Sequence, residues 1–255
     1  MFVSPPASLA EGKFVRAETR HQLKQDRFSQ TTIDMAERTV HWSVEHRNKL
    51  LVAGAIVLVL AGIAVGGWYY LSQQDQKASV EFTQAMRTLD TPVRPPNMPP
   101  QPDSPSFASS KERATTAHKQ FQEIADKYPH THAADFAHYF LGLTSADLAD
   151  NAAAERELQQ VASYRNADLS ALAKFALASV YRNTNRDKQA IEVYKQLIAK
   201  PAATVSKVAA QMELAAAYQG ANQPLEAKRI YEQIQKENPA SEAGQMASAK
   251  LQALK

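Results

Sequence analysis

A small residue followed four positions later by a large apolar residue recurs through the second half of this chain. The small residue is alanine each time, and successive copies lie 36 or 37 residues apart. The four pairs are Ala117 and Phe121, Ala154 and Leu158, Ala190 and Tyr194, and Ala227 and Tyr231. In paired antiparallel helices, a small side chain lets a neighbouring helix approach, and a large one fills the space beyond it. The period therefore predicts a stack of helical hairpins.

A second series with the same period falls in the alternate helices. It consists of Leu141-Gly142, Leu177-Ala178 and Leu214-Ala215, with Ser145, Tyr181 and Tyr218 four residues after the leucines. Together the two series resemble the tetratricopeptide repeat (TPR), whose short form is Leu-Gly-x-x-Tyr, then Ala-x-x-x-Phe, then Pro. The clearest copies are Leu177–Pro201 and Leu214–Pro239, while the copy that begins at Leu141 is degenerate. We predict an all-α fold, with a TPR-like α-solenoid over residues 111–255 that ends in a capping helix at 241–255.

One stretch of the chain is continuously apolar. The 22 residues Leu50–Leu71 include no charged residue and no Asn, Gln, Ser, Thr or Pro. As a helix they would extend ~33 Å, against a hydrocarbon core of ~30 Å. A cleaved signal peptide has a shorter apolar region closer to the N-terminus, and a buried helix of this length would show an amphipathic pattern. We therefore predict one N-terminal transmembrane helix, with Trp68, Tyr69 and Tyr70 at the membrane interface.

Basic residues near this span predict its orientation. Arg38, Arg47 and Lys49 lie in the fifteen residues before it, whereas only Lys77 lies in the fifteen after it. Positively charged flanks stay on the cytoplasmic side. The prediction places the tail, residues 1–49, in the cytoplasm and the C-terminal part on the opposite side of the membrane.

Two weaker patterns lie in and next to the anchor. Gly62 and Gly66 form a GxxxG motif, which allows two membrane helices to approach closely but also arises by chance in Gly- and Ala-rich segments. Apolar residues at helical spacing predict a helix over residues 20–48. This helix is either a recognised cytoplasmic tail or, as we favour, an extension of the anchor on the membrane surface.

The residues between the anchor and the repeats change character twice. Residues 72–90 continue a helical pattern, and residues 91–110 contain seven prolines. Proline supplies no backbone donor to a regular structure, so this stretch is an extended linker or a long loop between two helices. The predicted division is a cytoplasmic tail at 1–49, a transmembrane helix at 50–71, a helical stalk and Pro-rich linker at 72–110, and, on the opposite side of the membrane, a TPR-like domain at 111–255.

Composition excludes several classes of function. The absence of cysteine excludes disulfides, thiolate catalysis and cysteine-bound zinc. After the anchor only Gly142, Gly220 and Gly244 remain, too far apart to build a phosphate-binding loop. Residues 72–255 hold 21 basic and 20 acidic residues, without the basic excess of nucleic-acid-binding proteins. We predict no enzyme activity, no cofactor and no nucleic-acid partner.

One histidine-rich group could suggest a metal site. It comprises His130, His132, Asp135 and His138, close to Pro129. Metal sites on helices need ligands that converge on one face, such as histidines four residues apart. The spacing here gives only adjacent pairs on a face, so we interpret the group as a solvated helix start.

The most plausible binding site is the groove of the solenoid, which the first helix of each TPR hairpin lines. Offsets of −5, −2, +2 and +5 from the repeat leucines select one helical face. The resulting candidates are Phe136, Tyr139, Leu143, Leu172, Phe175, Ser179, Arg182, Met212 and Gln219. If these residues are exposed, they form an apolar groove with polar edges, suited to extended clients. If another helix covers them, they belong to the core.

The order of these parts carries a family resemblance. A short tail with a helical segment (Arg20–Phe28, RHQLKQDRF), one anchor and a TPR domain resemble the ancillary SecYEG translocon subunit (YfgM-like) family of bacterial inner membranes. The resemblance covers roughly residues 20–90 and 111–255, and the Pro-rich stretch departs from the pattern. It implies a periplasmic C-terminal domain and, as partners, translocon subunits, a membrane-anchored periplasmic chaperone and exported clients. The alternative is a general TPR scaffold in envelope assembly or cell-division coordination.

Overall fold

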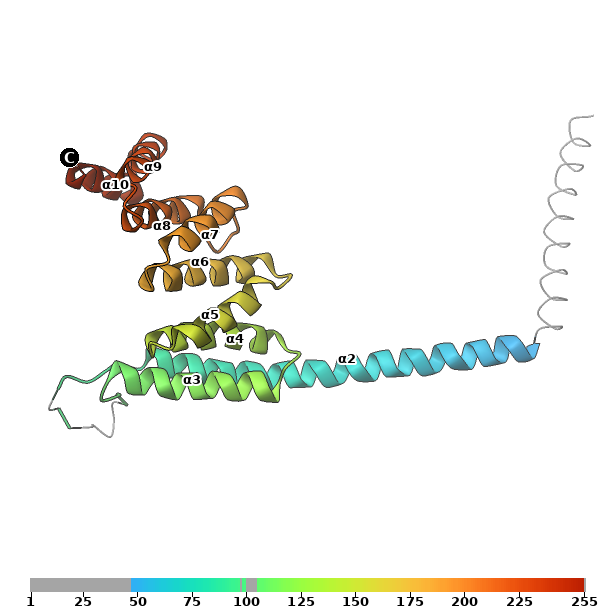
Figure 1. The fold of residues 1–255 in the computed structure, drawn as a ribbon. Coiled ribbons are helices and arrows are strands. Elements are labelled where there is room, and N and C mark those ends of the chain that lie inside the picture. Colours follow the sequence, from blue (N-terminus) through green and yellow to red (C-terminus); the bar gives the residue numbers. More distant parts are fainter. Residues whose placement is uncertain (1–46, 97, 100–104, 255) are drawn as a thin grey trace, which may run out of the picture. The chain divides into compact units, whose positions relative to one another are not determined.

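The computed structural model describes residues 47–96, 98–99 and 105–254 (Figure 1). Within these ranges the chain is helical and forms no β-strand, which confirms the predicted all-α class. The helices are α2 (Arg47–Asp90), α3 (Ser110–Lys127), α4 (His132–Asp147), α5 (Asn151–Ala162), α6 (Ala167–Asn183), α7 (Asp187–Ala199), α8 (Lys207–Gly220), α9 (Pro224–Glu237) and α10 (Glu242–Ala253). The chain divides into two compact units, residues 1–67 and 68–255, which we describe separately. The predicted helix at 20–48 lies almost entirely outside the described residues.

The described part of the first unit is the apolar start of α2. Among the described residues, α2 is the one helix long and apolar enough to cross a membrane. Leu58 is 74% exposed and Ile63 is 66% exposed. A Cβ atom added at Gly62 or Gly66 would meet no atom of the described residues within 4 Å. The helix therefore presents an apolar surface, free for lipid or for another helix, and the predicted contact through the two glycines stays a prediction.

The second unit is built from the predicted hairpins. Its alternating helices place the alanine series in α3, α5, α7 and α9, and all four alanines are completely buried. The large residue four positions later is buried in each copy as well. Each consecutive pair of helices from α3 to α10 is in contact. The small-then-large pattern therefore acts as predicted, as the packing contact inside and between hairpins.

The last part of α2 differs from the predicted stalk. Ala78 and Ala85 are completely buried in a cluster with residues of α3 and α4. The Phe82 ring lies 5.6 Å from that of Phe121 and 5.7 Å from that of Phe140, centroid to centroid. This segment is therefore the first helix of an additional hairpin, with α3 as its partner, and the repeat unit begins well before residue 111.

The Pro-rich stretch joins the two helices of that first hairpin. Its ends are paired, since Arg94 N–H donates to the Phe107 carbonyl at 2.9 Å and Phe107 N–H donates to the Pro92 carbonyl at 3.0 Å. The Arg113 guanidinium from α3 also donates to the Thr91 carbonyl at 3.2 Å. Of the two predicted alternatives, the structure has the long loop between helices, closed at its base.

The turns inside the hairpins that begin with α4, α6 and α8 share one backbone conformation. Ala149, Asn185 and Asn222 follow α4, α6 and α8 and have φ values of 64°, 58° and 58°. Asparagine adopts this left-handed region more readily than alanine does, so the first of these three turns is the most strained. These positions end the helix and redirect the chain into the next one.

Side chains cap most of the described helix starts. Ser109, Ser206 and Ser241 accept backbone N–H bonds at the starts of α3, α8 and α10. Asp150 caps α5, and Asn166 caps α6. Among the described residues no side chain caps α7, which has Asp187 in its first turn. The caps pair backbone N–H groups that a helix start otherwise leaves without a partner.

Candidate partner-binding face

The first helices of successive hairpins lie next to one another. α4 contacts α6, α6 contacts α8, and α8 contacts α10, whereas α3, α5, α7 and α9 make no such contacts among themselves within the described residues. In a curved stack of hairpins, the helices on the inner side come closest together. The helices that carry the nine candidate residues therefore lie on the inner side of the repeat unit.

All nine candidates remain partly accessible. They lie on α4, α6 and α8, and none of them is fully buried. Phe136 is 38% exposed, while Tyr139, Leu172 and Phe175 are half-buried and pack against the core from its edge. We call these nine residues the inner face. Its apolar members are partly buried and partly accessible, a state between the two alternatives that the sequence left.

Polar members of the inner face are tied to buried tyrosines of the second helices. The Ser179 hydroxyl lies 3.4 Å from the Tyr194 hydroxyl, and Gln219 accepts a hydrogen bond from Tyr231 at 3.3 Å. Burial raises the pKa of both tyrosines, so they stay neutral and able to donate. The inner face is therefore oriented by hydrogen bonds from beneath, which reduces the freedom a partner would have to remove.

The acidic residue Glu213, next to the inner face, was not among the residues predicted from the sequence. Arg182 on α6 forms an ion pair with Glu213 on α8, and both side chains are about one-third exposed. The offsets used for the prediction omit Glu213, because it directly precedes the repeat leucine Leu214. A search for acidic residues one hairpin away from Arg182 would have found it. The pair connects two hairpins and leaves the exposed part of the face mainly apolar.

The first hairpin adds aromatic residues next to the inner face. Phe121 stacks on Phe140 at 5.0 Å, and Phe82 lies edge-on to Phe136 at 6.3 Å. Offset and edge-to-face arrangements are the favoured geometries for such rings. Phe82 was missed as part of this site because its helix was predicted to be a stalk. The accessible Phe136 is thus held in place by an aromatic cluster from three helices.

An ion pair braces the α6–α7 hairpin against the α4–α5 hairpin. Glu155 on α5 lies 2.8 Å from Arg186, which precedes α7. Hydrogen bonding from Arg186 holds the pKa of Glu155 below its usual value. The Arg186 guanidinium also lies 4.6 Å from the centre of the Tyr181 ring. A single arginine therefore joins α5, α6 and α7.

This ion pair predicts a pH dependence of stability. Because the folded pKa of Glu155 is lowered, its stabilisation is complete above the unfolded value of about 4.3 and is lost as the pH falls through the folded value. We expect the melting temperature to fall more steeply below about pH 5 in the wild type than in Glu155→Gln. Far-UV circular dichroism during heating measures the melting temperature at each pH. Glu123→Gln is the control, because its pair with Lys119 is largely exposed, and an equal change in both variants would contradict the prediction.

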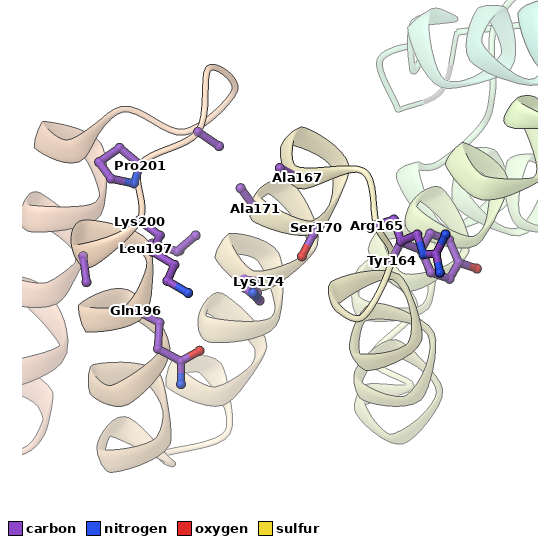
Figure 2. A pocket seen from close by; sticks show the side chains of 12 residues that line it. Tyr164, Arg165, Ala167, Ser170, Ala171, Lys174, Gln196, Leu197, Lys200 and Pro201 are labelled. Atoms are coloured by element: carbon purple, nitrogen blue, oxygen red, sulfur yellow. The ribbon is translucent and has the colours of Figure 1, made fainter.

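A cavity of about 510 Å³ lies at the other end of the α6–α7 hairpin (Figure 2). Its lining includes Ala171 and Lys174 from α6, and Leu197 and Lys200 from the end of α7. Arg165 in the preceding turn also lines it. These three basic residues form no ion pair within the described part of the chain. Their charge favours anionic groups over cations in this cavity.

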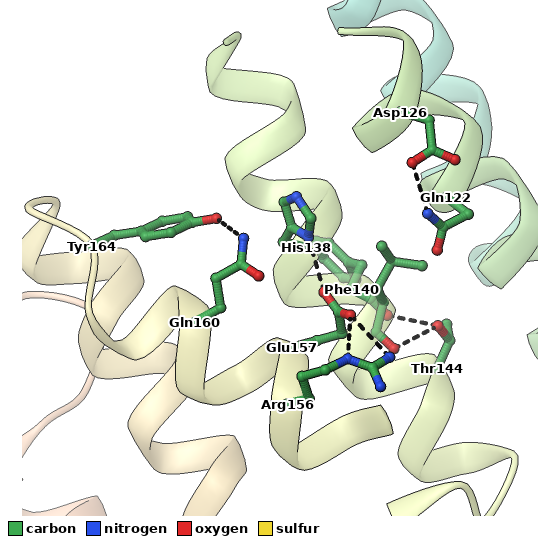
Figure 3. A network of polar contacts seen from close by, with 10 residues as sticks. Gln122, Asp126, His138, Phe140, Thr144, Arg156, Glu157, Gln160 and Tyr164 are labelled. Atoms are coloured by element: carbon green, nitrogen blue, oxygen red, sulfur yellow. Dashed lines mark hydrogen bonds and ion pairs between the residues drawn. The ribbon is translucent and has the colours of Figure 1, made fainter. Parts of the chain in front are cut away.

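The histidine-rich group is dispersed in the structure. His138 lies 2.9 Å from Glu157 on α5, and Arg156 contacts the same carboxylate at 3.4 Å (Figure 3). His130 and His132 are exposed at the start of α4. Over the described residues, no three His, Asp or Glu side chains come together as a metal site. Burial raises the pKa of Asp135, the fourth member.

Comparison with protein families agrees with this architecture. The model of the tetratricopeptide repeat-like domain matches residues 41–254, most of the chain. The match includes α2 as well as the later hairpins, in accord with the first hairpin found here. Neither curated proteins nor solved structures give a match. Proteins with TPR-like domains generally act as non-catalytic scaffolds for protein–protein interaction. The chain belongs to the tetratricopeptide repeat-like domain family.

Proposed function

We propose that this protein is a membrane-anchored scaffold that binds extended segments of other proteins along its inner face. The single observation that carries the proposal is the state of the nine inner-face residues. Their apolar side chains are ordered by the core on one side and open on the other. Binding sites of this kind combine apolar contact area with a few polar groups that give orientation.

The finer proposal concerns the site of action. The apolar part of α2 supports an anchor in the bacterial inner membrane, with the tail in the cytoplasm and the repeat unit in the periplasm. Resemblance to the ancillary translocon subunits supports translocon subunits, a membrane-anchored periplasmic chaperone and exported proteins as partners. In this proposal the protein holds newly exported chains next to their exit site and performs no chemistry on them.

Site-specific photo-crosslinking in intact membranes tests both parts. Probes at Phe175 and Met212 examine the inner face, and a probe at Gly66 examines the anchor. A probe at Lys228, exposed on the second helix α9, is the matched control. We expect exported proteins to be captured from the inner face and not from Lys228, and translocon subunits to be captured from Gly66.

The two probe sites separate the possible outcomes. Equal capture from Phe175 and Lys228 would contradict the inner face as the binding surface. Capture of envelope-assembly or division proteins, with no translocon subunit at Gly66, would contradict the translocon proposal and favour the general scaffold.

A further inference from the structure

The three hairpins that begin with α4, α6 and α8 differ at one packing position. Tyr181 on α6 and Tyr218 on α8 correspond to Ser145 on α4, at spacings of 36 and 37 residues. Tyr181 is 6% exposed, and its hydroxyl accepts a hydrogen bond from Gln159 at 3.1 Å. The Arg186 guanidinium covers its ring. The tyrosine thus fills the space between its own hairpin and the preceding one.

The hairpin that contains Ser145 keeps the glutamine of this framework without the tyrosine, and has an aspartate where the next hairpin has Arg186. Gln122 on α3 lies 37 residues before Gln159, and Asp150 lies 36 residues before Arg186. Both Gln122 and Asp150 line a cavity of about 210 Å³, and Ser145 lines it with them. The cavity therefore occupies the place in this hairpin where the next one holds a phenol ring.

The floor of this cavity contains an unpaired polar atom. Ser145 is 1% exposed, and its hydroxyl oxygen has no hydrogen-bond partner among the residues that the structure describes. Buried hydroxyl groups are normally paired, and an unpaired one calls for an explanation such as a bound ligand or water. In the next hairpin the corresponding hydroxyl, on Tyr181, is paired with Gln159. The cavity thus has both an unpaired hydroxyl oxygen and unfilled space.

The remaining walls suit an amphipathic ring. Leu141 and Leu148 supply apolar surface, and His118 and Gln122 supply polar groups from α3. Arg156 lines the same cavity and is exposed, with two long contacts of 3.4 Å, from Nε and Nη2, to the adjacent Glu157 (Figure 3). Glu157 itself is engaged by His138. Arg156 therefore remains available to cover an aromatic ring, as Arg186 covers Tyr181.

We propose that this cavity binds a phenol group, supplied by a tyrosine side chain of a partner protein. All nine tyrosines of the chain lie among the described residues, and none of them lines the cavity. The phenol therefore comes from another molecule. The bound hydroxyl pairs with Ser145 or Gln122, and the ring takes the place that Tyr181 fills in the next hairpin. This site lies on α3, α4 and α5 and is separate from the inner face.

The test uses the purified full-length protein in detergent and 4-methylphenol as the probe. Ligand-observed NMR and thermal unfolding should give saturable binding with a stoichiometry of one and a raised melting temperature. Toluene, which has the same shape without the hydroxyl, should bind about tenfold more weakly, the factor that corresponds to one net hydrogen bond. N-acetyltyrosine amide should compete with 4-methylphenol, and N-acetylphenylalanine amide should compete less.

Two reciprocal variants use the neighbouring hairpin as an internal standard. Ser145→Tyr should fill the cavity from within, raise the melting temperature without probe and abolish probe binding. Tyr181→Ser should open the corresponding cavity in the next hairpin and give a stoichiometry of two. If Ser145→Tyr does not fold, Ala153→Phe blocks the same cavity from α5, since Ala153 lines it.

Specific results would overturn the inference. Absence of any saturable 4-methylphenol signal would mean that the cavity holds only water. Equal signals from the wild type and Ser145→Tyr would mean that the probe partitions into detergent. Neither outcome depends on the inner-face crosslinks, so this inference and the proposed function can fail independently.

Discussion

A version of the protein that begins at Ser109 is expected to lose its cooperative unfolding transition, whereas a version that begins at Ser72 keeps it. Residues 72–90 supply one wall of the first hairpin, where Ala78 and Ala85 are completely buried. Phe121 is fully buried in the structure. Without this wall its ring would be exposed to water. Burying such a ring contributes about 1.5–3 kcal/mol, a large part of the roughly 5–15 kcal/mol that holds a domain folded.

The same wall also supplies polar contacts. Glu81 accepts hydrogen bonds from Lys127 at 2.6 Å and from the Tyr128 hydroxyl at 2.7 Å. These bonds hold the pKa of Glu81 below its usual value and raise that of Lys127. Removing Glu81 therefore leaves the half-buried end of α3 without its partners. This loss adds to the loss of apolar packing in the shorter version.

Urea titration followed by far-UV circular dichroism measures the effect. Phe82→Ala in the longer version should lower the free energy of unfolding by about 2–3 kcal/mol, less than for a fully buried ring. Val80→Ala on the same helix is the control and should change it by less than about 0.5 kcal/mol, because Val80 is 70% exposed. Equal midpoints for the two versions would show that residues 72–90 do not belong to the repeat unit.

The second large effect is expected in the anchor. Replacing both Leu58 and Ile63 by arginine should release the protein from membranes. Each arginine near the centre of a spanning helix costs about 2.5–3.5 kcal/mol on the insertion scale, so the pair costs about 5–7 kcal/mol. Alkaline carbonate extraction, followed by sedimentation of the membranes, measures the integrated fraction. Wild-type protein should remain in the pellet, and the double variant should appear in the supernatant.

A matched variant separates loss of insertion from a general effect of added charge. Val80→Arg places the same side chain on α2, outside the predicted span, at an exposed position. This variant should stay in the pellet. Retention of the Leu58→Arg, Ile63→Arg double variant in the pellet would contradict the prediction that the apolar part of α2 lies in lipid.

The sequence predicted the later hairpins well because their packing depends on a strict period. Ala154, Ala190 and Ala227 are all buried where the spacing placed them. The first hairpin escaped this reasoning. Its two helices are separated by the seven prolines of residues 91–110, so the spacing of 36 or 37 residues between the first helices of successive hairpins is lost between α2 and α4. A period search cannot find a repeat whose internal loop is much longer than the others.

The candidate site stays a prediction, and its burial could not be read from the sequence. Offsets from Leu141, Leu177 and Leu214 selected residues that share a helical face and are all at least partly accessible, because helical geometry is local. How deeply Phe175 or Tyr139 is buried depends on the angle between adjacent hairpins, which side-chain spacing does not contain. The cavity beside Ser145 likewise could not be predicted from side-chain spacing. The sequence shows Ser145 in place of the repeat tyrosine. Only the structure shows that no other described side chain fills the space of the missing ring.

The buried side chains of the described repeat unit gather in separate clusters, and this has a mechanical consequence. One cluster lies around α2, α3 and α4, a second extends from α5 to α8, and a third lies around α8, α9 and α10. In a solenoid each repeat contacts mainly its neighbours. Such a stack deforms most easily at the junctions between separate hydrophobic clusters. Two of the inner-face helices, α4 and α8, stand at these junctions. A polypeptide bound across these junctions would hold neighbouring clusters together. Binding at the inner face should therefore make the solenoid stiffer.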